Sequence, residues 1–235
     1  MSVITPMISD RGPKAWAFYN QIYTIQNHNS FNLIMNDNSA KIYLSTINDD
    51  IILNGDVIFN FKETNQRLNK YLAYVSDSAL AEEYRNKFDS INPLLNISLL
   101  ISDGNLQGSK QGIGFDRGDT FLWALDQYFN DISEIVLNHA TWQMAQRPRD
   151  FLEYIKTMAN CNPHDVIFYY CLIFYNLEIN ISNKELIRDL IHSGSRAIDN
   201  EHAAIRYMDL ALRFWNARKT SINNYTNLDL QLFSK

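Results

Sequence analysis

Cysteine and histidine are the residues of this chain whose spacing comes nearest to a chemical motif. Cys161 and His164 stand three positions apart, which is a spacing that zinc ligands use. A structural zinc ion needs four ligands, however, and the nearest further candidates, His139 and Cys171, fall in other predicted elements. The sequence therefore predicts no metal site.

The sequence can reveal a nucleophilic cysteine or a catalytic acid pair only in part, because the partners in such sites come together from distant positions in the chain. Cys171 lies within a strongly apolar segment, where the charged thiolate is disfavoured. The acidic pairs Asp49-Asp50 and Glu82-Glu83 are adjacent in sequence, and we interpret them as solvated charges of a turn and of a helix. We expect no catalytic residue, no cofactor and no enzymatic activity.

Five of the eight glycines fall between residues 104 and 118. This segment contains neither the GxxxxGK[ST] order of a phosphate-binding loop nor a GxGxxG motif. We interpret 104–118 as a Gly-rich surface loop. Arg147 and Arg149 stand near two aromatic residues, a combination that can bind phosphate, but salt bridges at a helix start are the favoured interpretation.

The charge and length of the chain limit its function further. The 235 residues carry a formal net charge of −5 with a pI near 5.5, which argues against a general nucleic-acid binder. Two cysteines make no disulfide framework, so a reducing compartment is favoured. The N-terminus shows no secretory signal, and the longest apolar run, 166–175, is about half of the roughly 20 residues that a membrane helix needs. We expect a soluble intracellular protein without a membrane partner.

Helical and strand patterns alternate along the chain, which predicts an α+β fold in a single domain, 1–235. An arm and a helix beginning at Pro13 occupy 1–26, a mixed strand and helix core that includes the Gly-rich loop occupies 27–198, and a helix and tail occupy 199–235. Predicted strands are 31–35, 41–46, 50–61 and 94–101, and a hairpin turn is predicted at Asn54-Gly55. A buried strand or strand pair is predicted at 166–181, and an edge strand at 228–232. Predicted helices are 62–75, 78–88, 119–137, 149–159, 183–192 and 199–219.

The segment 199–219 has the clearest helical pattern in the chain. Asp199 or Asn200 can cap its start. An apolar stripe at three- and four-residue spacing is predicted to face the core, and it consists of Ala204, Ile205, Met208, Leu212 and Trp215. Arg218 and Lys219 stand near its end, where positive charge suits the helix dipole.

The predicted N-terminal helix is aromatic over nearly half of its circumference. The side chains that make it so are Trp16, Phe18, Tyr19, Ile22 and Tyr23. They would either pack in the core of the chain itself or dock on a neighbouring subunit, because aromatic anchors dominate interfaces. Both alternatives are open from the sequence, and these five residues are the candidate assembly contacts.

The stretch Met208 to Asn216, MDLALRFWN, resembles the C-terminal helix motif of cypovirus polyhedrins, the occlusion-body proteins of insect cytoplasmic polyhedrosis viruses. The matching residues are Asp209, Leu210, Ala211, Leu212, Arg213, Phe214 and Asn216. Trp215 stands where the family motif has a cysteine. Weaker similarities follow in the same order, namely Arg11-Gly12 with a following Phe18-Tyr19-Asn20, and His139 close to Trp142.

This resemblance implies a compact antiparallel β-sandwich core flanked by helices, with a protruding N-terminal helix that reaches neighbouring subunits. It implies a homo-oligomer, a trimer, that stacks into a crystalline lattice in the cytoplasm of the infected host cell. Such a viral occlusion body embeds and protects virus particles, and it dissolves in the alkaline insect midgut. Some family members hold nucleotides in the lattice, but no residue of this chain is assigned to nucleotide binding.

The composition supplies a hypothesis for alkaline release. Full titration of the 13 Tyr, 10 Lys and 2 Cys would change the net charge from −5 to about −30, so that packed chains would repel each other. We hypothesise that tyrosines at lattice contacts, with Tyr19 and Tyr23 as candidates, are the trigger. Dissolution at about pH 8, well below the titration of tyrosine and lysine, would contradict this hypothesis.

Two other classes of protein stay open. A viral nucleoprotein or other RNA-associated protein would bind through a basic groove with a steep dependence on salt, although the acidic balance counts against it. An α+β enzyme would assemble its site from scattered residues, with the Gly-rich loop as a lid. A convergent pocket with perturbed acids or histidines would favour the enzyme.

Overall fold

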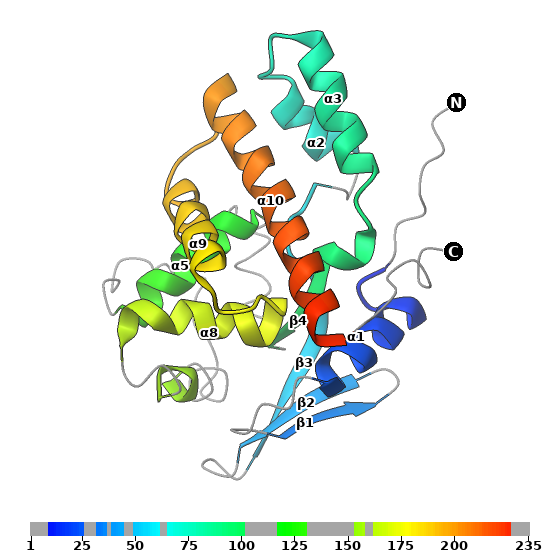
Figure 1. Ribbon diagram of the computed structural model, residues 1–235, viewed down its shortest axis with the longest axis vertical. Helices are drawn as coiled ribbons and strands as arrows, with labels where there is room; N and C mark the ends of the chain where they lie inside the picture. The colour runs from blue at the N-terminus through cyan, green and yellow to red at the C-terminus, as the bar shows by residue number, and fades with distance from the viewer. Residues whose placement is uncertain are drawn as a thin grey trace.

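The computed structural model describes residues 9–25, 32–36, 39–44, 49–61, 65–101, 117–130, 153–157 and 162–226. One antiparallel sheet in the order β1-β2-β3-β4 lies at one end of the molecule, and helices dominate the rest (Figure 1). The strands are β1 (Asn32–Asn36), β2 (Ser39–Leu44), β3 (Asp49–Val57) and β4 (Ile97–Ile101). The helices are α1 (Pro13–Ile25), α2 (Asn65–Leu72), α3 (Ser78–Asp89), the 3-10 turn η1 (Pro93–Asn96), α5 (Gly118–Phe129), α8 (Pro163–Tyr175), α9 (Ile181–Gly194) and α10 (Glu201–Thr226). The predicted α+β class is confirmed.

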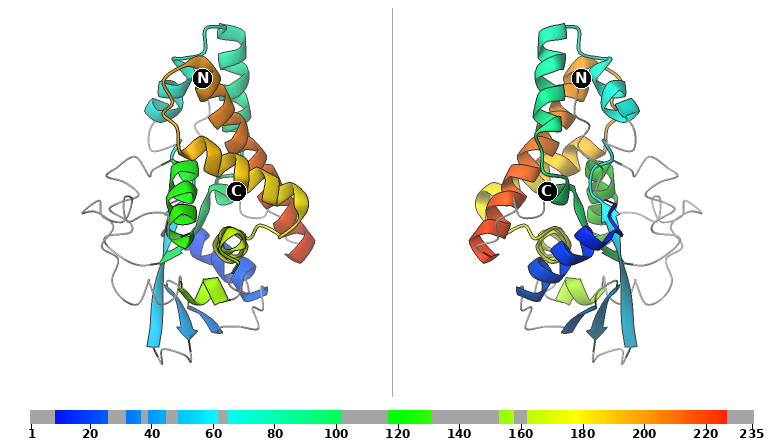
Figure 2. Two further views of the ribbon diagram at one scale, coloured as in Figure 1. Left: turned by 90° about the vertical axis from the view of Figure 1, so that its left-hand side faces the viewer. Right: turned by 90° about the vertical axis from the view of Figure 1, so that its right-hand side faces the viewer.

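The sheet follows the alternation of apolar and polar residues along its strands. Ile42 of β2 lies opposite Ile51 of β3, and both are buried, whereas Ile34 and Ile52 on the alternate positions are exposed. Helix α1 contacts β1 and β4, and the side views show it beside the sheet (Figure 2). The strands predicted at 31–35, 41–46, 50–61 and 94–101 are confirmed as β1 to β4, with shifted ends.

The predicted hairpin turn at Asn54-Gly55 is wrong, because both residues lie inside β3. The glycine is needed there for a close approach rather than for a turn. A Cβ atom on Gly55 would lie 1.9 Å from the carbonyl oxygen of Asp10, in the segment that precedes α1. A side chain at this position would therefore push the N-terminal segment away from the sheet.

The predicted buried strand at 166–181 is also wrong, because most of this segment belongs to helix α8. A continuous apolar run does not distinguish a buried strand from a buried helix by periodicity. The helix signals are at its ends. The side chain of Asn162 accepts the backbone N–H of His164, Pro163 occupies the first turn, and Asn176 ends the helix in the left-handed conformation at φ 54°.

The other predicted helices are found where the structure describes them. Helices α2, α3 and α9 correspond to 62–75, 78–88 and 183–192, and α5 corresponds to the described part of 119–137. Residues 153–157 are helical within the predicted 149–159. The predicted edge strand at 228–232 and nearly all of the Gly-rich segment 104–118 lie outside the described residues.

Neither the second sheet of a sandwich nor a protruding N-terminal helix is present among the described residues. The described strands form one sheet, and α1 lies against β1, β4 and α10. The five aromatic and aliphatic side chains of α1 predicted as assembly contacts are all at most 5% exposed. Their burial within the chain itself removes them from the described surface.

Helix α10 is the longest element and runs from the α2–α3 end of the molecule down to α1 (Figure 1). Asn200 caps its start by accepting the backbone N–H of Ala203, as one of the two predicted caps. Ala204, Met208 and Trp215 face the core as predicted, but Ile205 and Leu212 are only partly buried. The core face is completed by Tyr207, Ala211, Phe214 and Arg218.

Arg218 is completely buried, and it does not lie near the helix end as predicted, because α10 continues to Thr226. Its Nε donates to the carbonyl of Tyr175 at 2.8 Å, and its Nη1 donates to those of Leu95 at 2.8 Å and Ile97 at 2.6 Å. Its Nη2 donates to the Oδ1 of Asn176 at 3.2 Å. These hydrogen bonds connect α10 to the end of α8, to η1 and to β4.

Replacement of this arginine tests its structural role. We expect Arg218→Met to lower the free energy of unfolding by about 3–5 kcal/mol, because several buried carbonyl oxygens would lose their donors. Urea denaturation followed by circular dichroism measures the change. The matched control is Lys219→Met, since Lys219 is the adjacent exposed cation and should change stability by no more than about 0.5 kcal/mol. Equal effects of the two substitutions would contradict the role assigned to Arg218.

Candidate functional site

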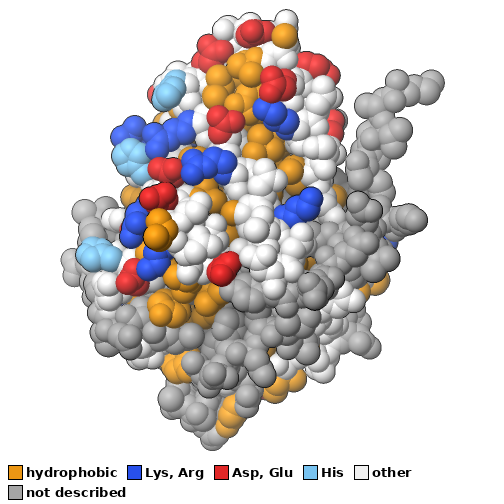
Figure 3. Space-filling model, viewed as in Figure 1, with side chains coloured by type: hydrophobic (Ala, Val, Ile, Leu, Met, Phe, Trp, Pro, Cys, Tyr) orange, Lys and Arg blue, Asp and Glu red, His pale blue; other side chains and the backbone are white. Residues whose placement is uncertain are grey.

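The polyhedrin-like motif has an inner and an outer half. Leu210, Ala211 and Phe214 are buried, whereas Asp209, Arg213 and Asn216 are exposed. The outer residues line an open groove of about 820 Å³ along α10, between α3 and α9. Other residues of the groove are Lys87, Ser90, Ile91, Asp189, His202, Ile205, Arg206, Leu210 and Leu212. Figure 3 shows this face as hydrophobic side chains interspersed with charges of both signs.

The α10 groove carries charges of both signs, some of which are paired with each other and some with residues outside the groove. The Tyr84 hydroxyl donates to Asp209 at 2.6 Å, and burial together with this hydrogen bond raises the pKa of Tyr84. Arg213 forms an ion pair with Asp189 at 3.2 Å, with both side chains about half exposed. Exposed pairs of this kind contribute little to stability. The groove is therefore a mixed polar surface and not a basic channel of the kind that a nucleoprotein needs.

Trp215, which replaces the cysteine of the family motif, is a core residue. It is 3% exposed, and its ring packs edge-on against Phe59 and Phe88. Its Nε1 donates to the Oδ1 of Asn96 at 3.1 Å, and Asn96 also forms two hydrogen bonds with the backbone of Phe59. A cysteine would leave much of this aromatic volume empty, so the neighbouring phenylalanines and Trp215 fit one another as a set.

The candidate assembly residues belong to this interior as well. Tyr23 donates to the carbonyl of Phe174 and accepts the backbone N–H of Leu99 at 3.2 Å. Burial raises the pKa of Tyr23 to about 12 and that of Tyr19 well above its ordinary value. The hypothesis that these two tyrosines titrate at lattice contacts is therefore wrong for the described chain, because both lie inside the subunit.

A second hollow lies between α5, α8 and α9. It has a volume of about 580 Å³, and its walls combine aromatic, basic and acidic side chains. The lining residues are Trp123, Asp126, Gln127, His164, Ile167, Phe168, Arg188, Ile191, His192 and Ser195. Burial raises the pKa of Asp126, and the nearby His164 and a hydrogen bond from Asn130 partly offset the rise. An acid with a raised pKa beside a histidine can exchange protons with a bound ligand.

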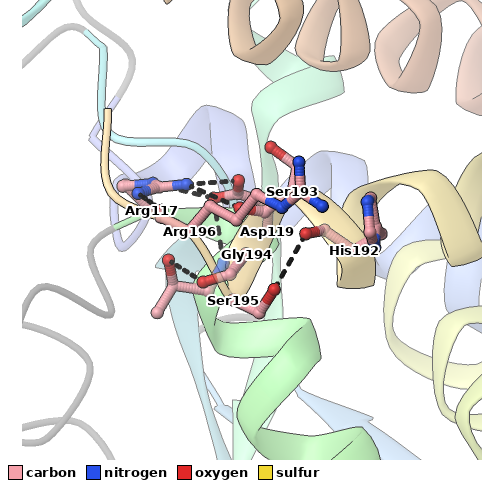
Figure 4. A network of polar contacts seen from close by, with 8 residues as sticks. Arg117, Asp119, His192, Ser193, Gly194, Ser195 and Arg196 are labelled. Carbon is pink, nitrogen blue, oxygen red and sulfur yellow. Dashed lines mark hydrogen bonds and ion pairs between the residues drawn. The ribbon is translucent and has the colours of Figure 1, made fainter. Parts of the chain in front are cut away.

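A buried ion pair holds the wall of this α5–α8–α9 pocket in place. The Asp119 side chain is 0% exposed and pairs with Arg117 at 2.6 Å, at the start of α5. Arg117 also donates to the carbonyls of Ser193 and Arg196 at the end of α9 (Figure 4). Burial alone would lower the pKa of Arg117, but the hydrogen bonds and charge of Asp119 outweigh this effect and raise it.

Close backbone packing reinforces the same junction. A Cβ atom on Gly194 would lie 2.1 Å from the carbonyl oxygen of Asp119, so only glycine allows α9 to end this close to α5. The Thr120 hydroxyl donates to the carbonyl of Gly194 at 3.2 Å. The relative position of α5 and α9, and with it the width of the pocket, is thus set at one end by Arg117, Asp119 and Gly194.

Two of the histidines considered from sequence come together, because His164 and His192 both line the α5–α8–α9 pocket. His202 lines the α10 groove, and Cys171 is fully buried, which raises its pKa. Cys161, His139, Arg147 and Arg149 lie outside the described residues. Within the part of the chain that is described, no three His, Cys, Asp or Glu side chains are grouped so that they could hold a metal ion.

Sequence reasoning missed the polar residues that matter most at the α5–α8–α9 pocket. Arg117, Asp119, Asp126 and Arg188 show no recognisable motif. Arg117 and Asp119 pair at the start of α5, and the further contacts of Arg117 with α9 and of Arg188 with Phe168 come from other elements. An acidic residue in the first turn of α5 was the single available signal, and it is equally typical of a solvated helix start. Separately, none of the described helices combines the length and the apolarity required to cross a membrane.

Comparison of the chain with models of protein families, with curated proteins and with solved structures finds no match.

The buried ion pair leads to a prediction about stability. We expect Arg117→Ala to lower the free energy of unfolding by about 3–5 kcal/mol, because it leaves the carboxylate of Asp119 buried without its counter-charge. Chemical denaturation at pH 7 measures the loss. Arg196→Ala is the control, since the Arg196 side chain is exposed and its contact with Arg117 uses only the backbone carbonyl. A loss below about 1 kcal/mol for Arg117→Ala would show that the pair is not structural.

The buried tyrosines predict alkaline instability. A tyrosine whose pKa is higher in the folded than in the unfolded chain stabilises the fold fully below about pH 10, and this contribution is lost as the pH rises further. For Tyr23, with a folded pKa of about 12, the loss is about 3 kcal/mol, and Tyr19, Tyr170 and Tyr175 act in the same direction. We expect the free energy of unfolding, measured in urea, to fall steeply between about pH 10 and 12.

Substitution of Tyr170 gives the clearest test of this alkaline loss of stability. Its hydroxyl is buried and has no hydrogen-bond partner among the described residues, so Tyr170→Phe should not destabilise the protein at pH 7. It should retain more stability than wild type at about pH 11, because one buried ionisable group is removed. Tyr169→Phe, at the adjacent and only partly buried position, should behave like wild type. Identical alkaline profiles for all three proteins would show that ionisation of Tyr170 does not contribute to the loss of stability.

Proposed function

We propose that this chain is a structural protein of the cypovirus polyhedrin class, which assembles into protective crystals and releases its cargo at alkaline pH. The observation that carries the proposal is the arrangement of the motif Asp209 to Asn216. Its apolar residues anchor α10 in the core, while Asp209, Arg213 and Asn216 lie on an open groove of charged and apolar side chains. A surface of this mixed kind suits contact between folded protein chains.

The proposed partners are other copies of the chain and virus particles. Trimers would form the unit of a lattice in the cytoplasm of the infected cell, where the occlusion body forms around virions. The near balance of charges in the groove, in which Arg213 pairs with Asp189, would let copies approach without strong repulsion at neutral pH. Nucleotides could be held in the lattice as in some family members, but no residue is assigned to them.

Alkaline release has a physical basis in the buried tyrosines rather than in tyrosines at contacts. Tyr19, Tyr23, Tyr170 and Tyr175 are buried, and the pKa of each is raised by that burial. Their ionisation above about pH 10 favours the unfolded chain, and deprotonation of surface lysines adds negative net charge in the same range. Both effects would weaken a lattice built from folded subunits.

Expression in insect cells tests the proposal directly. We expect cytoplasmic microcrystals whose suspension stays turbid at about pH 8 and clears above about pH 10, where the buried tyrosines begin to favour unfolding. Light scattering of the purified particles against pH measures this. Crystals of Tyr170→Phe should clear at a higher pH than crystals of the control Tyr169→Phe. A freely soluble monomer would overturn the proposed function, and clearing at about pH 8 would overturn the release mechanism.

A further inference from the structure

We propose that the α5–α8–α9 pocket binds a small organic carboxylate that carries an aromatic ring. The volume of about 580 Å³ is in the range of small-molecule sites, and the lining has an apolar side and a basic side. In this proposal the ring lies against Trp123 and the neighbouring isoleucines, and the carboxylate pairs with Arg188. The inference concerns a site separate from the α10 groove and does not depend on self-assembly.

The basic side of the pocket is formed by Arg188 of α9. Its guanidinium carbon lies 5.2 Å from the ring centre of Phe168, and no ion pair of Arg188 is present among the described residues. Lys184 lies over the same ring at 4.9 Å, but its ammonium is paired with Asp165 at 3.3 Å and it does not line the pocket. Arg188 therefore keeps a planar set of donors for a carboxylate, which guanidinium groups bind in bidentate geometry.

The apolar side of the pocket explains the requirement for a ring. Trp123 of α5 is partly buried and contributes a flat aromatic surface to the wall. Ile167 of α8 and Ile191 of α9 complete this side, while the ring of Phe168 lies next to the guanidinium of Arg188. An aromatic ligand would cover apolar surface there, whereas a simple anion such as acetate would contact only the basic side.

The titratable groups facing Arg188 predict how binding depends on pH. Asp126 comes from α5, His164 from α8 and His192 from α9, and the neighbouring pair of Asp165 and Lys184 balances its own charge. Burial raises the pKa of Asp126, so its negative charge is lost at a higher pH than usual. This loss makes the pocket more positive as the pH falls, so affinity for a carboxylate should increase.

Titration calorimetry of the folded chain with phenylacetate tests the proposal. We expect binding of phenylacetate, and affinity at least tenfold weaker for acetate, which lacks the ring, and for phenethylamine, which carries the opposite charge on a similar body. The affinity for phenylacetate should rise as the pH is lowered, because the Asp126 carboxylate becomes protonated at a higher pH than usual. Equal binding of the amine, no binding of phenylacetate, or an affinity independent of pH would overturn the proposal.

Matched variants assign the binding to this pocket. Arg188→Ala should weaken phenylacetate at least tenfold, since it removes the bidentate partner of the carboxylate. Lys184→Ala removes a cation from the same Phe168 ring but not from the pocket wall, and it should change affinity by less than twofold. Asp126→Asn should reduce the dependence of affinity on pH, because it removes the carboxylate whose pKa is raised. Equal losses for Arg188→Ala and Lys184→Ala would show that general surface charge, and not the pocket, attracts the ligand.

Discussion

The guanidinium group of Arg218 lies where α10, the end of α8, the 3-10 turn and the first residue of β4 meet. Its hydrogen-bond acceptors are carbonyl oxygens of Tyr175, Leu95 and Ile97, which the ends of regular elements leave without a partner. Burial of an arginine is costly, and so is burial of unpaired carbonyls. The hydrogen bonds between the arginine and the carbonyl oxygens offset both desolvation costs. They also connect the helical part of the molecule to its sheet.

The pair of Arg117 and Asp119 has a similar role near Tyr207 of α10. It joins the start of α5 to the end of α9, and the ring of Tyr207 on α10 lies 5.0 Å from the guanidinium carbon of Arg117. Gly194 allows the two backbones to approach closely at this point. The hollow between α5, α8 and α9 exists because this junction and the apolar packing of α8 hold three helices at fixed positions.

These polar connections also separate the stable interior from the surfaces available for function. The aromatic side chains of α1 lie inside, so contacts between copies would have to use other surfaces, of which the groove along α10 is the best defined. Tyr19 and Tyr23 are among these buried side chains, so their ionisation would lower the stability of the fold rather than act at contacts between copies. A protein built in this way would remain folded at neutral pH and lose both its stability and its charge balance under strongly alkaline conditions.

Local sequence signals determined much of the secondary structure. Alternation in 32–57 specified three strands, Asn200 and the spacing of Ala204, Met208 and Trp215 specified α10, and Pro13 specified the start of α1. The sequence did not distinguish helix from strand in 166–175, because a segment buried on all sides has no periodicity to read. It also left open whether the aromatic side of α1 faces the core or another subunit. Only the tertiary structure decided these points, together with the burial of Arg218 and the contacts of Arg117 with the end of α9, because these side chains find their partners through packing of distant elements and not through spacing along the chain.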